Sequence, residues 1–413
     1  MATAAGQDIP VLRPRSEAEL VDAIVAAVAA GRRLEVVGRG ALGAFGRPVD
    51  APCRLDVSGL TGIVSFEPGE LVVTVRAGTP LDELEALLAG HAQCLAFEPP
   101  DLGPLLGAPA GGVTVGGIVA TGISGPRRFK AGAVRDHVLG ARAVSGRGEL
   151  FVCGGKVVKN VTGYDLPKLL VGSLGTLAVL SEVTLKVVPA PVETRSLLLA
   201  GLSPDVAVGV MTRGLHTAAA VSGACHLPGD VSRPPLEVAS GLAAGASLTA
   251  LRVEGSPVSV NARLTMLRQL LPGAGQEVLE RDASMRFWRA VADVAPFAGT
   301  DRIVWRLSVP PARGGGVLRR LLAGLRGARG YLDWAGGLVW LELADDGNAR
   351  TEDVRGIVAE NGGHATLVRA PPALRRELAV FQPPGPVERR IVDGLKRQFD
   401  PQGVLNAGRM YAP

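Results

Sequence analysis

The chain has 413 residues, of which 47% are hydrophobic and 20% charged, and its formal net charge at pH 7 is +5. A chain of this length is expected to form two or three domains with substantial cores. The mild basic excess suits an anionic cofactor or a small acid, but it is not the dense patch of a nucleic-acid-binding protein, and only four tryptophans, three tyrosines and nine phenylalanines are available for base stacking.

The cysteines predict neither a disulfide framework nor a metal site. Four are scattered along the chain with no Cys-x-x-Cys pair and no iron–sulfur or zinc spacing: Cys53, Cys94, Cys153 and Cys225. They are expected to be reduced thiols of a cytoplasmic protein that binds no metal. The N-terminus lacks a signal-peptide pattern. The uncharged run Leu102–Pro126 is too rich in glycine and proline for a membrane span, so no transmembrane segment is expected.

The first 90 residues predict helices and strands in alternation. They are a helix over Ser16–Gly31, strands at Leu34–Val37 and Leu71–Arg76, and a helix that begins near Thr79. Ser16 and Glu19 have the spacing of a capping box, and Gly31 is a natural helix end. Thr79 and Pro80 suit the cap and the first turn of the second helix.

A glycine-rich loop follows the first strand. Gly38–Gly43 reads GRGALG, close to the GxGxxG fingerprint of Rossmann folds. That fingerprint needs a helix to open at the third glycine, whereas Gly46, Pro48 and Pro52 interrupt any helix here. We therefore expect a loop whose backbone N–H groups hold a diphosphate, with a plain glycine-rich turn as the alternative.

A second stretch, Gly111–Phe129, consists mostly of glycine and small residues. This composition is unfavourable for a helix and for a packed core, and backbone with so few side chains can lie closely against a flat ligand. Four apolar residues require burial and disfavour a flexible linker: Val113, Val115, Ile118 and Val119. We expect this stretch to contact a bound cofactor.

The third stretch, Cys153–Pro189, combines a polar turn, a glycine-spaced loop and a strand. In chain order it holds Lys159, Asn160 and Thr162 in the turn, Gly172 and Gly175 in the loop, and alternating polar and apolar residues over Glu182–Val187. Alternation with a period of two is typical of a half-buried strand. The stretch is expected to form a third wall of the cofactor site, and a tight turn between packed elements is the alternative.

Strands and helices alternate after Pro191, with fewer glycine-rich loops. Strands are expected at Leu197–Ala200, Leu248–Val253, Ile303–Val309 and Val339–Leu343, and helices at Val258–Leu271, Val317–Leu325 and Arg350–Glu360. The pattern fits an open sheet with helices on one side, a split-βαβ layout. A last helix is expected from Pro386 to about Phe399, and no internal repeat is detected.

Taken in order, these segments resemble the FAD-binding domain of the vanillyl-alcohol-oxidase (PCMH-type) superfamily. They are the loop near residue 40, GGVTVGGIVATG, GAVRDHVLGARAV and TGYDLPKLLVGSLGTLAVLSEVTLKV. More closely, the chain looks like the FAD-binding E subunits of bacterial glycolate oxidases. The motifs that carry this likeness are Glu98-Pro99-Pro100, Gly125–Arg128, Val134-Arg135-Asp136, Gly155–Leu174, Trp305-Arg306, Asp333–Gly337, Gly362–Thr366 and Phe399–Tyr411.

The resemblance implies an α+β fold: a PCMH-type two-subdomain FAD-binding domain over residues 1–190, a ferredoxin-like α+β cap over residues 191–385, and a tail, residues 386–413, that returns to the FAD-binding domain. It implies FAD contacts at Gly38, Arg39, Gly40, Ala41, Leu42 and Gly43 for the pyrophosphate, at Gly112, Thr114, Gly116, Gly117, Thr121 and Gly122 for the flavin and phosphates, near Val179 for the adenine, and at Asn406. Many members attach FAD through a histidine in the first loop; none is present here, so FAD is expected to be noncovalent. Ala41 also lacks the hydroxyl of related loops.

Oxidation of a 2-hydroxy acid on a flavin needs a cation for the carboxylate, a base for the hydroxyl proton and a Cα–H directed at the flavin N5. His364, within GGHAT, is the candidate base, and a histidine that orders a cap strand is the alternative. Arg306 is the candidate carboxylate ligand, with a surface salt bridge as the alternative. Trp305, Trp334 and Trp340 are expected in the cap core.

The resemblance further implies a function and partners. The chain would be the FAD-binding subunit of a glycolate oxidase or dehydrogenase complex that converts glycolate to glyoxylate and passes electrons through FAD to an iron–sulfur subunit. A larger FAD-linked catalytic subunit would be the second partner, and any membrane association would come through these partners. Two alternatives stay open: a stand-alone FAD-dependent 2-hydroxy-acid dehydrogenase and a non-catalytic flavoprotein scaffold.

Overall fold

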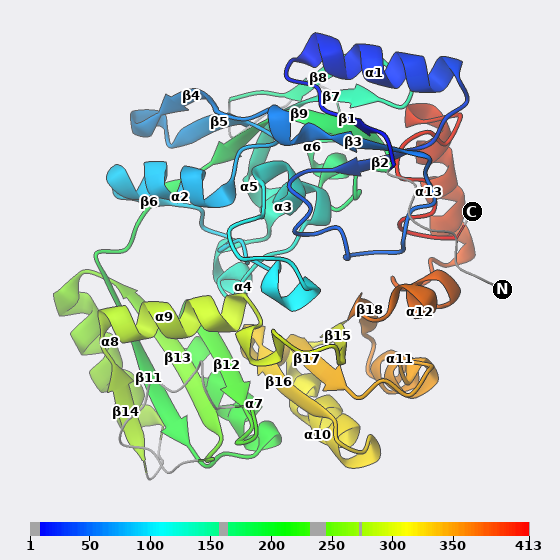
Figure 1. Cartoon of the computed structure of the whole chain (residues 1–413). Coiled ribbons are helices and arrows are strands. Elements are labelled where there is room, and N and C mark those ends of the chain that lie inside the picture. The colour runs from blue at the N-terminus through cyan, green and yellow to red at the C-terminus, as the bar shows by residue number, and fades with distance from the viewer. Residues whose placement is uncertain (1–8, 157–163, 232–244, 272–274, 413) are drawn as a thin grey trace.

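The computed structural model describes residues 9–156, 164–231, 245–271 and 275–412. Residues 9–190 form what we call the N-terminal half, at the top of Figure 1, and residues 193–377 form the cap below it. The expected polar turn with Lys159, Asn160 and Thr162 lies outside the described residues.

The N-terminal half contains two main sheets. One is parallel with the order β1-β3-β2, and the other is antiparallel with the order β4-β5-β9-β7-β8. The strands are β1 (Val11–Leu12), β2 (Leu34–Val37), β3 (Cys53–Asp56), β4 (Ile63–Glu67), β5 (Val72–Arg76), β7 (Val138–Ser145), β8 (Leu150–Gly154) and β9 (Ala178–Lys186). The helices include α1 (Glu17–Ala29), α2 (Leu81–Gly90), α3 (Val115–Thr121), α4 (Arg128–Ala131), α5 (Val134–His137) and α6 (Leu166–Leu170). The expected strands at 34–37, 71–76 and 182–187 are confirmed as β2, β5 and part of β9.

The two predicted helix starts differ in outcome. Ser16 caps α1 as expected, because its Oγ accepts a hydrogen bond from the backbone N–H of Glu19 at 3.2 Å. Thr79 does not cap α2. Its hydroxyl instead donates to the carbonyl of Gly62 at 3.2 Å and accepts from the Gly62 N–H at 3.0 Å, so the side chain fixes a turn beside β4.

The glycine-rich second stretch contains a helix that its composition did not predict. α3 is seven residues long, and Thr114 caps it by accepting a hydrogen bond from the Gly117 N–H at 3.1 Å. Burial of Val115 and Ile118 compensates for the low helix propensity of glycine. A Cβ at Gly116 would lie 2.8 Å from the Ala77 carbonyl oxygen, so the glycine is needed for the helix to approach that backbone.

The cap is one eight-stranded antiparallel sheet with the order β14-β11-β13-β12-β16-β17-β15-β18. Its strands are β11 (Glu193–Ala200), β12 (Gly223–Leu227), β13 (Leu248–Gly255), β14 (Gln276–Leu279), β15 (Ile303–Ser308), β16 (Arg329–Asp333), β17 (Leu338–Leu343) and β18 (His364–Arg369). Its helices are α7 (Pro204–Leu215), α8 (Pro257–Leu270), α9 (Arg281–Ala292), α10 (Gly314–Gly324), α11 (Thr351–Glu360) and α12 (Pro372–Glu377). The expected ferredoxin-like layout is therefore present, and every strand and helix predicted after Pro191 is found.

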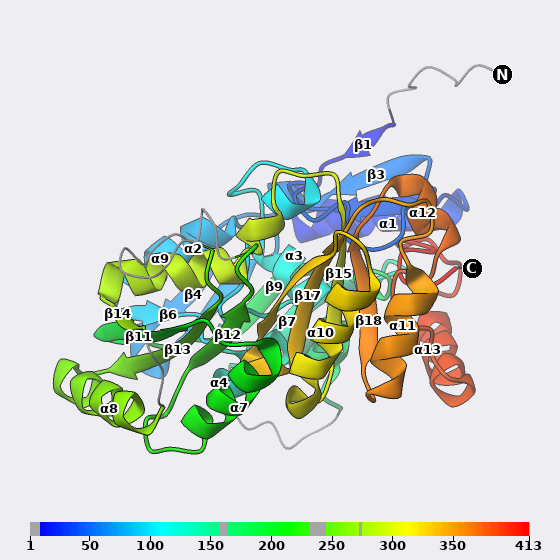
Figure 2. The ribbon, with the colours of Figure 1, turned by 90° about the horizontal axis from the view of Figure 1, so that it is seen from below.

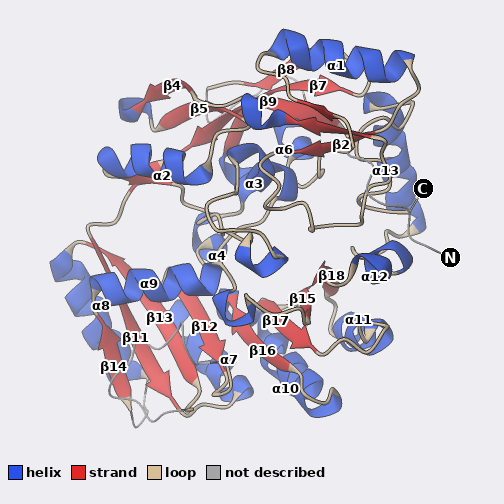
Figure 3. Ribbon diagram, viewed as in Figure 1, coloured by secondary structure: helices blue, strands red, loops and turns tan. Residues whose placement is uncertain are grey.

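The cap contains a structural repeat, although no internal repeat was detected in the sequence. The segments β11-α7-β12-β13-α8-β14 and β15-α10-β16-β17-α11-β18 are two βαββαβ units, joined edge to edge where His226 of β12 pairs with Leu332 of β16. Helices α7, α8, α10 and α11 cover one face of the joint sheet, as Figure 2 shows from below. The other face carries α9 and is directed at the N-terminal half (Figure 3).

The C-terminal segment packs against the N-terminal half. Helix α13 (Pro386–Phe399) lays Leu395 and Phe399 on the core of the five-stranded sheet. Leu405 then forms a parallel bridge to Leu34 at the start of β2. Within the described ranges, no helix has both the length and the apolar character needed to cross a membrane.

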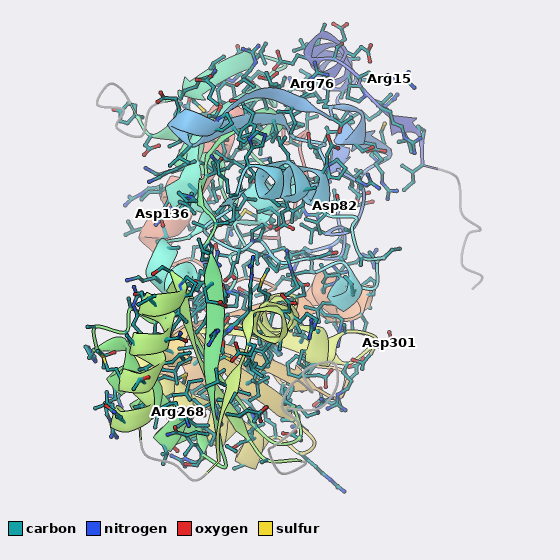
Figure 4. The ribbon with its side chains drawn as sticks, turned by 90° about the vertical axis from the view of Figure 1, so that its left-hand side faces the viewer. Arg15, Arg76, Asp82, Asp136, Arg268 and Asp301 are labelled. Carbon is teal, nitrogen blue, oxygen red and sulfur yellow. The ribbon has the colours of Figure 1, made fainter. Side chains whose placement is uncertain are left out.

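Four charged side chains join the cap to the N-terminal half. The guanidinium of Arg252, on β13, donates to both oxygens of Glu98 at 2.6 and 2.8 Å and is only 2% exposed. Arg127 donates to Glu254, also on β13, so each half supplies one arginine and one glutamate. Burial opposes the charge of Glu254, but Arg252 and Arg127 hold its pKa at about 2. Figure 4 shows the two halves stacked, with Arg76 and Asp82 above and Arg268 and Asp301 below.

Replacement of Arg252 by Met should lower the free energy of unfolding by about 3–5 kcal/mol, because Glu98 and Glu254 would keep buried charge without this partner. The matched control is Arg320→Met. It removes an exposed ion pair with Glu360 and should cost less than about 1 kcal/mol. Urea unfolding of both variants measures the difference, and equal losses would contradict the structural role of this ion network.

Candidate functional site

A cavity in the N-terminal half collects the three glycine-rich stretches. Its empty volume, which includes space open to solvent, is about 800 Å³. Thirteen of the fourteen expected cofactor residues line it: Gly38, Arg39, Gly40, Ala41, Leu42, Gly43, Gly112, Thr114, Gly116, Gly117, Thr121, Val179 and Asn406. Gly122 is the exception. It ends α3 with a φ of +66° and packs against Gly172.

The first glycine loop has backbone N–H groups that are available to a ligand. In the described part of the chain, the backbone N–H groups of residues 39–42 donate to no protein acceptor. The carbonyl oxygens that follow are bound by two arginines. Arg409 donates to the carbonyls of Leu42, Gly43 and Phe45 at 3.2, 3.2 and 3.0 Å, from the C-terminal tail.

The second arginine comes from the cap. Arg375, on α12, donates to the carbonyls of Ala44 and Gly46 at 2.6 and 2.7 Å. Both arginines are buried, 6% exposed each. Together they fix the carbonyl side of the loop, and the N–H side forms a concave donor surface of the kind that binds phosphate oxygens. The sequence analysis did not identify Arg409 or Arg375, because no local pattern links them to a loop more than 300 residues away.

The opposite wall approaches the loop so closely that small residues are required. A Cβ at Gly38 would lie 2.9 Å from Thr114 Oγ1, and a Cβ at Gly112 would lie 3.1 Å from the Cβ of Ala41. Thr114 Oγ1 accepts from Gly117, and its own proton has no acceptor among the described residues. This hydroxyl lines the cavity and offers the donor that Ala41 lacks.

Asn406 connects two walls of the cavity. Its Oδ1 accepts from the Val36 N–H at 2.8 Å, and its Nδ2 donates to the Leu174 carbonyl at 2.7 Å. The residue has a φ of +42°, which asparagine tolerates better than most residues. The tail thereby fixes the end of β2 and the third glycine loop relative to each other.

These walls fit FAD. Unpaired N–H groups at residues 39–42 suit a diphosphate, and the apolar side chains of Leu42, Val113 and Leu174 suit a flat ring system. The first loop contains no histidine, and noncovalent binding of FAD stays a prediction.

The two expected catalytic residues lie together, but they do not line this cavity. Arg306 on β15 and His364 on β18 occupy the sheet face that is directed at the N-terminal half, with His364 opposite Ser308 on the edge strand. Arg306 forms no ion pair with any described residue, so the salt bridge considered as its alternative role is absent there. Its Nε is buried without a partner.

Charge and burial perturb both candidates. Burial, assisted by the charge of Arg128, lowers the pKa of Arg306 to about 10, so the group stays cationic at neutral pH. Burial, with the charges of Arg306 and Arg128, lowers the pKa of His364 below its ordinary value, which favours the neutral imidazole that a base requires. The His364 side chain nevertheless remains exposed at the sheet edge.

The three tryptophans named above are buried as expected. Trp305 and Trp340 pack in the cap. Trp334 does more, because its Nε1 donates to the Gly125 carbonyl at 3.0 Å and so connects the cap to the loop after α3. The guanidinium carbons of Arg128 and Arg306 lie 4.4 and 5.0 Å from the centre of its ring.

Comparison with known proteins gives matches over the whole chain. Residues 10–154 match the family model described as FAD binding domain. The glycolate oxidase subunit GlcE of Escherichia coli is 34% identical over 394 residues, which cover 95% of this chain and 97% of that protein. The glycolate oxidase subunit GlcD of Bacillus subtilis is 32% identical over 204 residues, 48% of this chain and 41% of that protein.

A solved structure confirms the fold. The 4-ethylphenol oxidase from Gulosibacter chungangensis has a TM-score of 0.71 and 14% identity, and the match covers 97% of this chain and 89% of that one. At this identity the likeness concerns the fold alone.

Replacement of Arg409 by Met should weaken FAD binding about tenfold, since lost charge-assisted hydrogen bonds of about 1.5–3 kcal/mol would leave the loop carbonyls free to turn into the site. Arg397→Met, on the exposed side of α13, is the control and should bind FAD normally. Equilibrium dialysis against FAD gives both affinities. Equal affinity in the two variants would show that Arg409 does not shape the loop.

Asp333 gives a pH-dependent prediction. Burial raises the pKa of the Asp333 carboxyl to about 7, well above the ordinary aspartate value. The folded state therefore holds a proton that the unfolded state has released, so stability should fall as pH rises from about 4 to about 7. Relative to Asp333→Asn, the wild-type free energy of unfolding should fall by up to about 1.4 kcal/mol per pH unit in this window. Thermal unfolding at several pH values measures it, and parallel curves would refute the buried protonated carboxyl.

Proposed function

The chain belongs to the family of the glycolate oxidase subunit GlcE, and on this basis we propose that it is the FAD-binding subunit of a complex that oxidises glycolate to glyoxylate. The observation that carries the proposal is a match spanning nearly all of both chains, 95% and 97%. FAD is the cofactor, and the cavity that combines the three glycine stretches is its proposed site.

Bound FAD supplies the acceptor for the two electrons and one hydrogen that leave the hydroxyl-bearing carbon. The remaining tasks fall to the chain. The N–H groups of residues 39–42 hold the diphosphate, Arg306 binds the substrate carboxylate, and neutral His364 accepts the hydroxyl proton at its ring nitrogen. In the same positive field Arg306 stays charged and His364 stays neutral. Carboxylate binding by Arg306 and proton acceptance by His364 are therefore compatible.

Electrons must leave the reduced cofactor. The four cysteines are free and dispersed over both halves, and their sequence positions do not have cluster spacing. We therefore assign the next carrier to an iron–sulfur partner subunit and assign a further partner to the larger FAD-linked subunit, in line with the GlcD relative. Free thiols suit a cytoplasmic location, and contact with a membrane would come through the partners.

A stand-alone 2-hydroxy-acid dehydrogenase is the second candidate. One observation favours it: Arg306 is a half-buried cation that forms no ion pair with a described residue, which suits an acid-binding site within this chain.

The deciding experiment compares the chain alone with the chain in its partner complex. Both preparations should be yellow, and glycolate added without oxygen should bleach the flavin of the complex. Bleaching of the isolated chain by glycolate would favour the stand-alone enzyme. A colourless chain that FAD cannot reconstitute would refute both flavin functions.

Replacement of His364 by Ala should slow glycolate-driven bleaching about 10²–10⁴-fold, the usual contribution of a general base. His216→Ala, on an exposed helix end, is the control and should react at the wild-type rate. Stopped-flow absorbance measures both rates. An unchanged rate in the His364 variant would remove this residue from the mechanism.

The lowered pKa of His364 also sets the pH profile. The neutral ring is the active form, so the rate should stay constant above the lowered pKa and fall as pH drops through it. The acidic limb of kcat/KM should therefore lie below the ordinary histidine pKa of about 6.5. A limb centred above 6.5 would contradict the assignment of His364.

A further inference from the structure

Two arginines meet at one tryptophan where the halves join. Arg128 begins α4 in the N-terminal half, and Arg306 lies on β15 of the cap. Their guanidinium carbons are 4.4 and 5.0 Å from the centre of the Trp334 ring. Each contact is a cation–π interaction, so the ring partly stabilises both charges.

Neither arginine forms an ion pair with a described residue, although other arginines at this junction do. Arg127 and Arg252 share Glu98 and Glu254, and Arg289 donates to Glu85. By contrast, the side chains of Arg128 and Arg306 donate no hydrogen bond to any described residue, and the Nε of Arg306 is buried. Arg128 is exposed, whereas Arg306 is half-buried, and burying a cation without an anion is costly unless a ligand compensates.

The local field is positive. The charge of Arg128 adds to burial in lowering the pKa of Arg306, so the two guanidiniums act on each other. Asp333 is the acid that acts on Arg306, but its Oδ1 accepts from the Trp334 N–H at 2.7 Å, and burial raises its pKa to about 7. The carboxyl is therefore only partly ionised at neutral pH. Asp136 is the acid that acts on Arg128, and its Oδ2 accepts from the Ala133 N–H at 2.8 Å. Both arginines also lower the pKa of His364.

The surrounding packing holds this arrangement. Trp334 donates to the Gly125 carbonyl at 3.0 Å and so fixes the loop that leads into Arg128. Phe129, the next residue, packs against both the helix-covered core of the cap and the core at the junction. The two cations are therefore brought together only when the halves are docked.

We propose that Arg128 and Arg306 form one binding site for the carboxylate of a small organic acid, with Trp334 as its apolar wall. The inference rests on the proposed function for the identity of the acid, and it adds Arg128, from the N-terminal half, as a second substrate-binding residue. Guanidinium groups bind carboxylates through paired N–H donors, so two of them can hold one carboxylate from two sides.

The test uses oxalate, a small carboxylate that has no oxidisable C–H, with the full FAD-loaded chain. The variants are Arg128→Met and Arg306→Met. Arg135→Met is the control, because Arg135 is exposed and its charge acts on Arg128 without contact to Trp334. Titrations follow the flavin absorbance and, independently, the melting temperature.

Each test variant should weaken oxalate binding about tenfold or more, while the control should stay within about threefold of wild type. Arg128→Lys should restore part of the affinity. Arg306→Met should not lower the melting temperature in the absence of oxalate, because it removes an uncompensated charge. Unchanged oxalate binding in Arg128→Met, or no oxalate binding by the wild type, would overturn the inference.

Glycolate turnover in the assembled complex separates this inference from the proposed function. The expected result is a raised KM with little change in kcat for Arg128→Met. Oxalate binding that depends on both arginines, without glycolate oxidation by the wild type, would keep the site and refute glycolate as substrate. Glycolate oxidation with a wild-type KM in Arg128→Met would refute the site and keep the function.

Discussion

The cavity depends on how the first glycine loop is held. A loop binds a diphosphate best when its N–H groups are unpaired and its backbone is held in place by other contacts. Here two buried arginines, Arg409 from the tail and Arg375 from the cap, bind the carbonyls of residues 42–46 at the end of the loop. The donor surface is therefore produced jointly by the N-terminal half, the cap and the C-terminus, and α12 couples cap docking to the shape of the cofactor site.

The sequence predicts much of this site because its local rules are strong. Glycine marks the places where backbone must approach backbone, as at Gly38 beside Thr114, and a cap residue such as Ser16 marks a helix start. The same rules fail where contacts between residues far apart in the sequence determine the local structure. Helix α3 forms from a glycine-rich segment because its valine and isoleucine side chains are buried. Arg409 binds carbonyls more than 360 residues away, and no periodicity in the sequence can reveal such a contact.

The duplication in the cap is hidden from the sequence for a related reason. A βαββαβ unit constrains only the alternation of buried and exposed positions, so two units can share a topology without sharing residues. The sequence analysis did not predict strands β12, β14, β16 and β18. Their positions depend on pairing with other strands of the sheet. β18 illustrates this: it begins at His364 and lies at the sheet edge, where β15 and the contacts of the junction determine its position.

The two βαββαβ units of the cap have different roles. The first unit supplies Arg252 and Glu254, whose charges are fully matched across the junction, and such matched pairs fix one docking geometry. The second supplies Arg306 and Trp334, where positive charge is left unmatched in the described residues. A partly buried cation without an ion-pair partner lowers the stability of the folded protein, so the rest of the interface must compensate for this loss. The compensated network on the first unit therefore makes possible the uncompensated site on the second, and stability and ligand binding are divided between two copies of one fold.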